Sequence, residues 1–168
     1  MILKQRGFSM GETRTRSSPP WLLPTICASV VVACAAPSVS PRSSEVTVQA
    51  LDYAFQLPDT LPSGPSAFRL HNAGKVPHEM IMVLLNPGVS VSQVMAEVGA
   101  GRDPEPLAAG IVGILIAGPG ETAVGALAVD LLPGRTYALI CNFQDAPDKP
   151  EHVGLGMISG RTVTAAPQ

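Results

Sequence analysis

The stretch HEMIMVLL, His78–Leu85, decides the fold because it is apolar on both faces after its first two residues. Such a strand is covered on both sides or lies centrally in a sandwich. By contrast, EVTVQALDYAF, Glu45–Phe55, alternates between apolar and polar residues from Val46 to Ala50. This period of two predicts a half-buried strand.

Three further segments are predicted strands. They are SAFRLHN (Ser66–Asn72), which ends at a turn, the apolar run from Ile111 to Ala117, and a last strand from near Gly156 to about Val163. The run from Ile111 to Ala117 is too short to cross a membrane, so we expect a buried strand there.

A hairpin is predicted at Leu132-Pro133-Gly134. The segments on either side, ETAVGALAVDL (Glu121–Leu131) and RTYALICNF (Arg135–Phe143), have strand character. Because Pro-Gly favours a tight turn, we expect the two segments to pair antiparallel.

The segment SVSQVMAEVGAG, which begins at Ser90, is the one helical candidate. Its apolar residues fall on one helical face, Ser90 can cap the helix, and Gln93 completes a capping box. The helix would lie in an insertion from Ser90 to about Ala109. Short strands with frequent Gly and Pro turns predict an all-β, antiparallel Greek-key sandwich with this single short helix.

The N-terminal residues 1–34 are predicted to be a signal peptide. Four basic residues precede an apolar stretch from Trp21 to Ala33, which is short for a permanent membrane span. Val31-Val32-Ala33-Cys34 resembles a bacterial lipobox, which predicts that Cys34 is lipidated and anchors the chain to the membrane. Ordinary cleavage after Ala35 is the alternative, and either process places the domain outside the cytoplasm.

Residues 35–44, AAPSVSPRSS, are predicted to be a flexible tether, followed by one domain over residues 45–165. From Ala35 onward the chain has seven Lys and Arg against twelve Asp and Glu, a net charge of −5. A nucleic-acid-binding protein normally needs a basic face, so we expect no nucleic-acid partner.

Cys141 is the only thiol of the predicted domain, since Cys27 and Cys34 belong to the targeting segment. An unpaired thiol in an oxidising compartment is buried and inert, bonded to another chain, or held by a metal. The loop CNFQDAPDKPEHVGLGM places Cys141 near His152 and Met157. If the strand that ends at Cys141 lies beside the one that starts at His78, all four side chains meet at one end of the sandwich.

Two imidazoles, a thiolate and a weak axial thioether form the ligand set of a blue-copper centre. Zinc gains little from a methionine, so Met157 favours copper. Simpler interpretations stay open: His78 as a polar residue at a strand start, and Met157 as core packing. Met80 and Met82 are predicted to be core residues because they lie within a continuous apolar strand.

The segment NAGKVPHEM, Asn72–Met80, resembles the first-histidine segment of cupredoxins such as plastocyanin, and CNFQDAPDKPEHVGLGM resembles their ligand loop. The resemblance implies a cupredoxin-like sandwich and a type 1 copper ion bound by His78, Cys141, His152 and Met157. The chain departs from the family pattern in three ways: the ten residues between Cys141 and His152, the helical insertion, and Glu79, where many cupredoxins have asparagine.

These observations predict an extracytoplasmic, membrane-tethered copper protein that carries single electrons to or from a redox protein partner in the cell envelope. A metal-free cupredoxin-like binding module is one alternative, and a copper storage or delivery protein is another. We do not expect an enzyme, because multicopper enzymes need further copper ligands and further domains, and this chain has no second histidine cluster.

Overall fold

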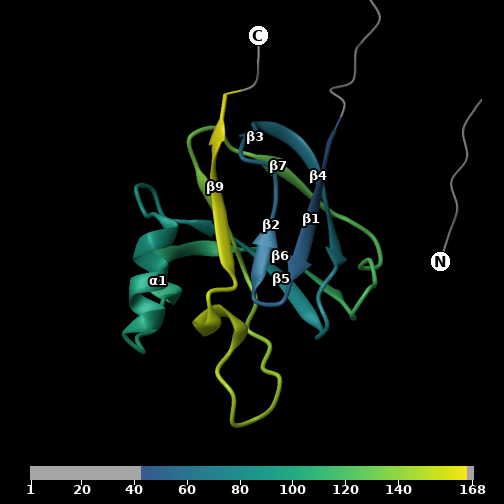
Figure 1. Cartoon of the computed structure of the whole chain (residues 1–168). Helices are drawn as coiled ribbons and strands as arrows, with labels where there is room; N and C mark the ends of the chain where they lie inside the picture. Colours follow the sequence, from purple (N-terminus) through teal and green to yellow (C-terminus); the bar gives the residue numbers. More distant parts are fainter. Residues whose placement is uncertain (1–42, 166–168) are drawn as a thin grey trace, which may run out of the picture. The chain divides into compact units, whose positions relative to one another are not determined.

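The computed structural model describes residues 43–165, which form two packed β-sheets with one helix at their side (Figure 1). The predicted signal peptide, its lipidated Cys34 and most of the predicted tether lie outside the described residues. The first strand begins at Ser44, one residue before the predicted start of the domain. No described helix is both long enough and apolar enough to span a membrane.

The two sheets have four and five strands. The first has the order β2-β1-β4-β7, with bounds β2 Ala54–Gln56, β1 Ser44–Leu51, β4 Gly64–Asn72 and β7 Leu127–Leu131. The second has the order β3-β9-β8-β5-β6, with bounds β3 Leu61–Pro62, β9 Ile158–Thr164, β8 Thr136–Ile140, β5 His78–Leu85 and β6 Ala108–Ala117. The predicted all-β sandwich with one short helix is confirmed. Two pairs, β1 with β4 and β3 with β9, are parallel, so the antiparallel description fits only the remaining pairs.

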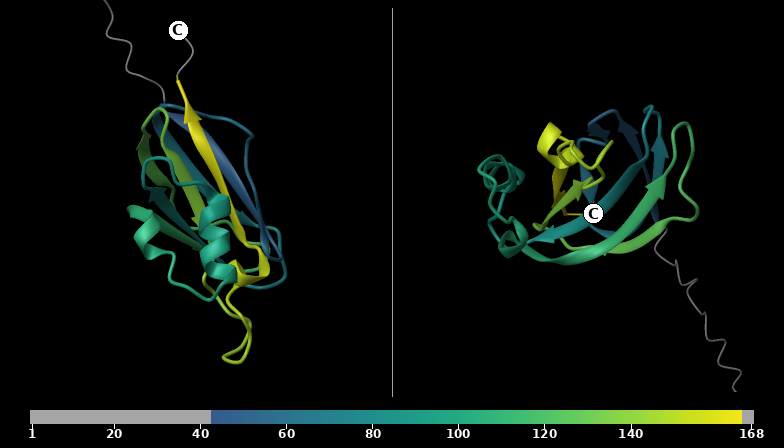
Figure 2. Two further views of the ribbon diagram at one scale, coloured as in Figure 1. Left: turned by 90° about the vertical axis from the view of Figure 1, so that its left-hand side faces the viewer. Right: turned by 90° about the horizontal axis from the view of Figure 1, so that it is seen from below.

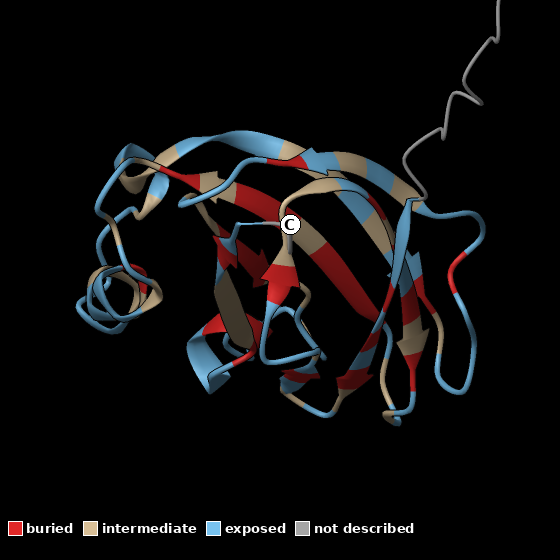
Figure 3. Ribbon diagram, turned by 90° about the horizontal axis from the view of Figure 1, so that it is seen from above, coloured by how far each residue is buried: buried red, intermediate tan, exposed pale blue. Residues whose placement is uncertain are grey.

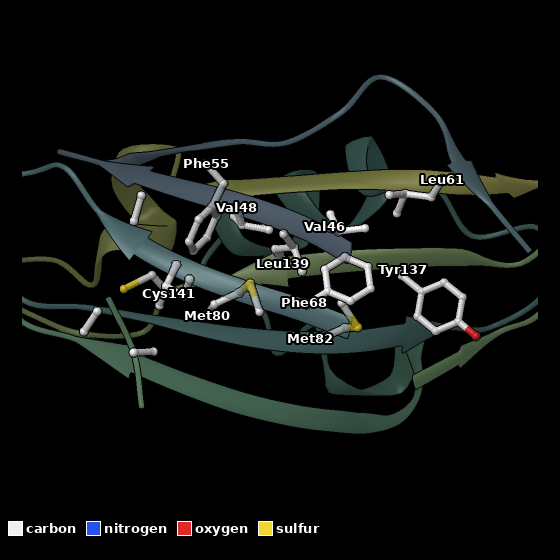
Figure 4. Close-up of a cluster of buried hydrophobic side chains, with 14 of the residues drawn as sticks. Val46, Val48, Phe55, Leu61, Phe68, Met80, Met82, Tyr137, Leu139 and Cys141 are labelled. Atoms are coloured by element: carbon white, nitrogen blue, oxygen red, sulfur yellow. The ribbon is translucent and has the colours of Figure 1, made fainter. Parts of the chain in front are cut away.

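The core fills the space between the inner faces of the two sheets (Figure 3). Alternate residues of β1 point into it, as predicted: Val46, Val48 and Ala50 are buried, whereas the residues between them are exposed. The central position of β5 is also confirmed, since it pairs with β8 on one side and β6 on the other. Met80 and Met82 are fully buried in the core (Figure 4).

The predicted strand Glu45–Phe55 is two strands. A tight turn separates β1 from β2, which folds back antiparallel and pairs Leu51 with Ala54. Tyr53 in this turn has φ 64°, the only positive φ of a non-glycine residue between residues 43 and 165. Such a backbone conformation is uncommon for a bulky residue, and the alternation of apolar residues does not predict it.

The predicted hairpin at residues 132–134 is wrong. β7 pairs with β4 in the first sheet, and β8 pairs with β5 and β9 in the second, so this turn crosses between the sheets. The physical reason is burial: Tyr137, Ala138 and Leu139 of β8 are all buried, which requires cover on both faces. β7 has one buried residue and also begins later than predicted, at Leu127.

The strand β6 is an edge strand, not the predicted buried strand. All of its residues except Ala117 are exposed or half-buried, and Ile111, Ile114 and Ile116 are among the most exposed large apolar residues of residues 43–165. The apolar composition of this segment does not distinguish a covered strand from an edge strand.

The helix α1, Val91–Gly99, lies against the outer face of the five-stranded sheet (Figure 2). The predicted capping box is confirmed: the backbone N–H of Gln93 donates to the Ser90 hydroxyl, and the Gln93 side chain accepts from the Ser90 backbone. Val94 is the buried residue that joins α1 to Val83, Leu85 and Ala138 of the sheet. Two short 3-10 helices complete the described structure, η1 (Glu105–Leu107) and η2 (His152–Leu155).

Candidate metal centre

His78 is held by strands. It is the first residue of β5, and its side chain is fully buried. The turn before it is fixed by Asn72, whose side-chain amide donates to the carbonyl groups of Val76 and Ala117. Gly74 in this turn leaves room for the imidazole, because a Cβ there would lie 3.0 Å from His78 Nε2 and 2.4 Å from Asp52 Oδ1.

Cys141 follows directly after β8 and is fully buried. Figure 4 shows its sulfur at one end of the core. Since β8 lies next to β5, the thiol comes close to the start of β5: the backbone N–H of Glu79 donates to Cys141 Sγ at 3.5 Å. The prediction that the strand before Cys141 lies beside the strand that starts at His78 is therefore confirmed.

His152 is the first residue of η2 and is 1% exposed. Its backbone N–H donates to the Phe143 carbonyl at 2.8 Å, and the N–H of Val153 donates to the Cys141 carbonyl at 2.8 Å. These two bonds bring the ends of the intervening residues together. The ten-residue gap thus projects from one end of the sandwich without separating Cys141 from His152 (Figure 1).

Three donor atoms from separate elements face one another in the buried interior. His78 Nδ1 lies 3.2 Å from His152 Nδ1, and Cys141 Sγ lies 3.4 Å from His152 Nδ1 and 3.9 Å from His78 Nδ1. A metal at about 2.0 Å from nitrogen and about 2.3 Å from sulfur holds such donors about 3.5 to 3.8 Å apart in a trigonal plane. The observed distances differ from these values by up to about 0.3 Å, so the triangle formed by residues 78, 141 and 152 could hold a metal ion.

The donor types fit copper. Thiolate suits Cu(I), and imidazole is acceptable to both Cu(I) and Cu(II), so two imidazoles and one thiolate make a trigonal copper site. The predicted convergence of His78, Cys141 and His152 is confirmed.

Met157 is linked to two of the candidate ligands by backbone hydrogen bonds. It is fully buried, its N–H donates to the His152 carbonyl at 2.9 Å, and its carbonyl accepts from the Cys141 N–H at 3.3 Å. It also belongs to the core cluster. Its role as the weak axial ligand stays a prediction.

Glu79 joins the strand side of the site to the loop side. Its carboxylate Oε1 accepts from the backbone N–H of Asn142 at 3.0 Å, while its own N–H donates to Cys141 Sγ. At 9% exposure the carboxylate is largely withdrawn from water. Glu79, which stands where many cupredoxins have asparagine, therefore bridges the two ligand segments.

The outer edges of the two imidazoles have different surroundings. His152 Nε2 lies 3.0 Å from Asp145 Oδ1, within hydrogen-bonding distance. His78 Nε2 has no hydrogen-bond partner in the described part of the chain, and Asp52 Oδ1 lies 3.7 Å away. Asp145 accepts a second hydrogen bond at Oδ2 from the Tyr53 hydroxyl at 2.5 Å.

Burial determines the protonation of the strand-held groups. It raises the pKa of the Cys141 thiol, and backbone N–H groups from Glu79 and Phe143 oppose this rise by donating to the sulfur. It also lowers the pKa of His78, to which the neighbouring His152 contributes. A neutral imidazole has a lone pair for a metal, whereas the thiol must lose its proton when a metal binds.

Sequence reasoning identified the three converging residues but missed Tyr53, Asp145 and Asp52. Asp145 lies inside the ligand loop, so its proximity to His152 was a weak signal. Tyr53 is 92 residues away from Asp145, and nothing in the local sequence indicates their contact. His71 is a half-buried residue of β4, and its Nδ1 is 3.2 Å from Thr122 Oγ1.

No family model and no curated protein matches this chain. Solved structures with a similar fold include dithionite-reduced auracyanin from Roseiflexus castenholzii, with 20% identity over 74% of this chain and 98% of that chain and a TM-score of 0.46. Auracyanin B has 19% identity over 76% of this chain and 92% of that chain, with a TM-score of 0.45. Auracyanin A from Chloroflexus aurantiacus, described as a blue copper protein, has 20% identity over 73% of this chain and 99% of that chain, with a TM-score of 0.41. Similarity at this level carries no evidence about the site of this chain, which rests on its own side chains.

Proposed function

We propose that this domain binds one copper ion through His78 Nδ1, His152 Nδ1 and the Cys141 thiolate, and that it carries single electrons. The observation that carries the proposal is the buried triangle of these three donor atoms. When bound, copper would supply a one-electron couple between Cu(II) and Cu(I).

The chain's own residues support a carrier in two ways. The donors come from β5, the end of β8 and η2, and Glu79 joins two of these segments, so the ligand positions are largely fixed before a metal arrives. A fixed, intermediate geometry limits the rearrangement that accompanies a change of one electron.

The burial of the site favours a carrier over copper storage or delivery. His78, Cys141 and His152 are each at most 1% exposed, so none of the three donor side chains is presented at the surface for exchange with a copper-accepting protein. The same burial, together with three inward-facing donor atoms, is not needed by a metal-free binding module.

The location and partner are part of the proposal. Given the basic and apolar N-terminus and the lipobox-like Val31-Val32-Ala33-Cys34, we propose an extracytoplasmic domain that a lipid on Cys34 tethers to the membrane. A carrier needs a donor and an acceptor, so we propose a redox protein of the cell envelope as its partner. The chain would act as a carrier and not as an enzyme.

The test is to add Cu(II) to the purified domain from Ser43 onward and record its visible spectrum. We expect an intense thiolate-to-copper charge-transfer band at one copper per chain, absent in Cys141→Ser, because serine offers no thiolate. Met80→Leu, another substitution of a fully buried sulfur residue, is the matched control and should keep the band. A colourless protein without stoichiometric copper would contradict copper binding, and a site without a reversible redox wave would contradict electron transfer.

A further inference from the structure

The contacts around His152 extend beyond the three donor atoms. Its Nε2 faces Asp145 Oδ1 at 3.0 Å, and the ring is 1% exposed. A buried ring nitrogen needs a hydrogen-bond partner, and an ionised carboxylate can only accept. Asp145 therefore keeps the proton of a neutral His152 on Nε2, which leaves the Nδ1 lone pair directed at Cys141 Sγ and His78 Nδ1.

Asp145 is itself positioned by Tyr53. The Tyr53 hydroxyl donates to Asp145 Oδ2 at 2.5 Å, and the tyrosine ring lies edge-on to the His152 ring with 5.0 Å between centroids. Tyr53 thus contacts both the carboxylate and the imidazole.

The backbone of Tyr53 supports a role at this site. Its φ of 64° is unusual for a bulky residue, and such conformations persist only where surrounding contacts stabilise them. Its side chain packs against the hydrophobic core and also contacts Asp145 and His152. The turn between β1 and β2 is therefore bent at the residue that reaches the ligand loop.

His78 provides an internal comparison. Its Nε2 has no hydrogen-bond partner within residues 43–165, and the nearest carboxylate oxygen, Asp52 Oδ1, lies 3.7 Å away. Only one of the two imidazoles is therefore bonded to a carboxylate. Hydrogen bonds from ligating histidines to carboxylates fix the ring and raise its basicity.

We propose that Asp145, held by Tyr53, is a positioning residue that fixes His152 as an Nδ1 donor and strengthens this donor, so that the site favours Cu(II) over Cu(I). This inference rests on the proposed copper site. A stronger imidazole donor stabilises the more highly charged ion, and the reduction potential of the site is lowered accordingly.

The first experiment uses the metal-free protein, so it does not depend on copper. Nitrogen-15 NMR of the histidine rings should show His152 with its proton on Nε2 in the wild type, and a larger share of the Nδ1–H form in Asp145→Asn. Asp148→Asn, which removes an equal charge from the same exposed loop, should leave the tautomer unchanged. An unchanged tautomer in Asp145→Asn would overturn the proposal.

The second experiment measures copper affinities and the reduction potential. Loss of a hydrogen-bond partner of a metal ligand typically costs 10- to 100-fold in affinity. If Asp145→Asn weakens Cu(II) binding about tenfold more than Cu(I) binding, the potential rises by about 59 mV. Tyr53→Phe, which keeps the ring and loses the hydroxyl, should shift it in the same direction by less, and Asp148→Asn should not shift it.

The results separate this inference from the function on which it rests. A wild-type protein with the charge-transfer band, whose potential is the same in Asp145→Asn as in Asp148→Asn, would overturn the role of Asp145 and leave the copper carrier standing. A wild-type protein that binds no copper would refute the carrier, and the NMR measurement would still decide whether Asp145 fixes the tautomer.

Discussion

The two histidines of the candidate site belong to regions that are held in different ways. His78 starts a central strand, within a sheet whose ladders and core side chains determine its place. His152 lies in a loop segment held by bonds to Phe143 and Met157 backbone groups and by the Asp145 side chain. Among residues 43–165, the outer nitrogen of His78 has no hydrogen-bond partner, whereas that of His152 has one. In this domain the strand histidine is placed by its sheet and by packing, whereas the loop histidine also has a hydrogen bond to a carboxylate.

The largest expected effect comes from the core below the strand side. Met80→Ala removes a fully buried side chain of β5, two residues after His78. It should lower the free energy of unfolding by about 2–5 kcal/mol. Leu155→Ala on the loop side, at 45% exposure, should change it by less than about 0.5 kcal/mol. Urea unfolding of the metal-free domain measures both. Equal losses would show that the loop side is packed as tightly as the strand side.

A smaller effect is expected at the residue that joins the two sides. Glu79→Ala removes the charged acceptor of the part-buried hydrogen bond from the Asn142 N–H, which should cost about 1–3 kcal/mol in the free energy of unfolding. Glu79→Gln keeps a side-chain oxygen and should recover most of this loss. The same unfolding experiment provides the measurement, and a Gln variant as unstable as the Ala variant would show that the charge, rather than the acceptor, matters.

The smallest effect is a pH dependence that differs between the two sides. Burial lowers the pKa of His78 in the folded state. Below about pH 6.5 the unfolded chain therefore binds a proton at this residue more readily than the folded chain does, and the free energy of unfolding decreases as the pH is lowered. The Tyr53 hydrogen bond lowers the pKa of Asp145, and stability from that group is lost only as the pH falls below about 3.9.

Unfolding midpoints of the metal-free domain, measured between about pH 7.5 and about pH 5, test the predicted effect of His78. We expect a decline in the wild type that is reduced in His78→Gln, since glutamine does not titrate. A decline of the same size in both proteins would assign the acid sensitivity to another group.

Local patterns predicted those parts of the fold whose cause is local. The alternation in β1 and the capping box of Ser90 and Gln93 appear in the structure as predicted, because burial of one strand face and helix capping depend on neighbouring residues. The hairpin at residues 132–134 failed because the Pro-Gly turn signal does not say which sheet the next strand joins. The run from Ile111 to Ala117 failed for a similar reason, since composition does not distinguish an edge strand from a covered one.

The sequence by itself determined which donors are available and in what order they occur: His78, Cys141 and His152, with Met157 as the predicted fourth. Only the tertiary structure decided that Nδ1 of both imidazoles faces the sulfur, that Glu79 joins the ligand segments, and that Tyr53 reaches Asp145. Residue types and spacing are properties of the chain, and they are readable without a fold. Contacts between residues tens of positions apart depend on which strands pair and on which turns bend, and only the packing of the whole domain determines these.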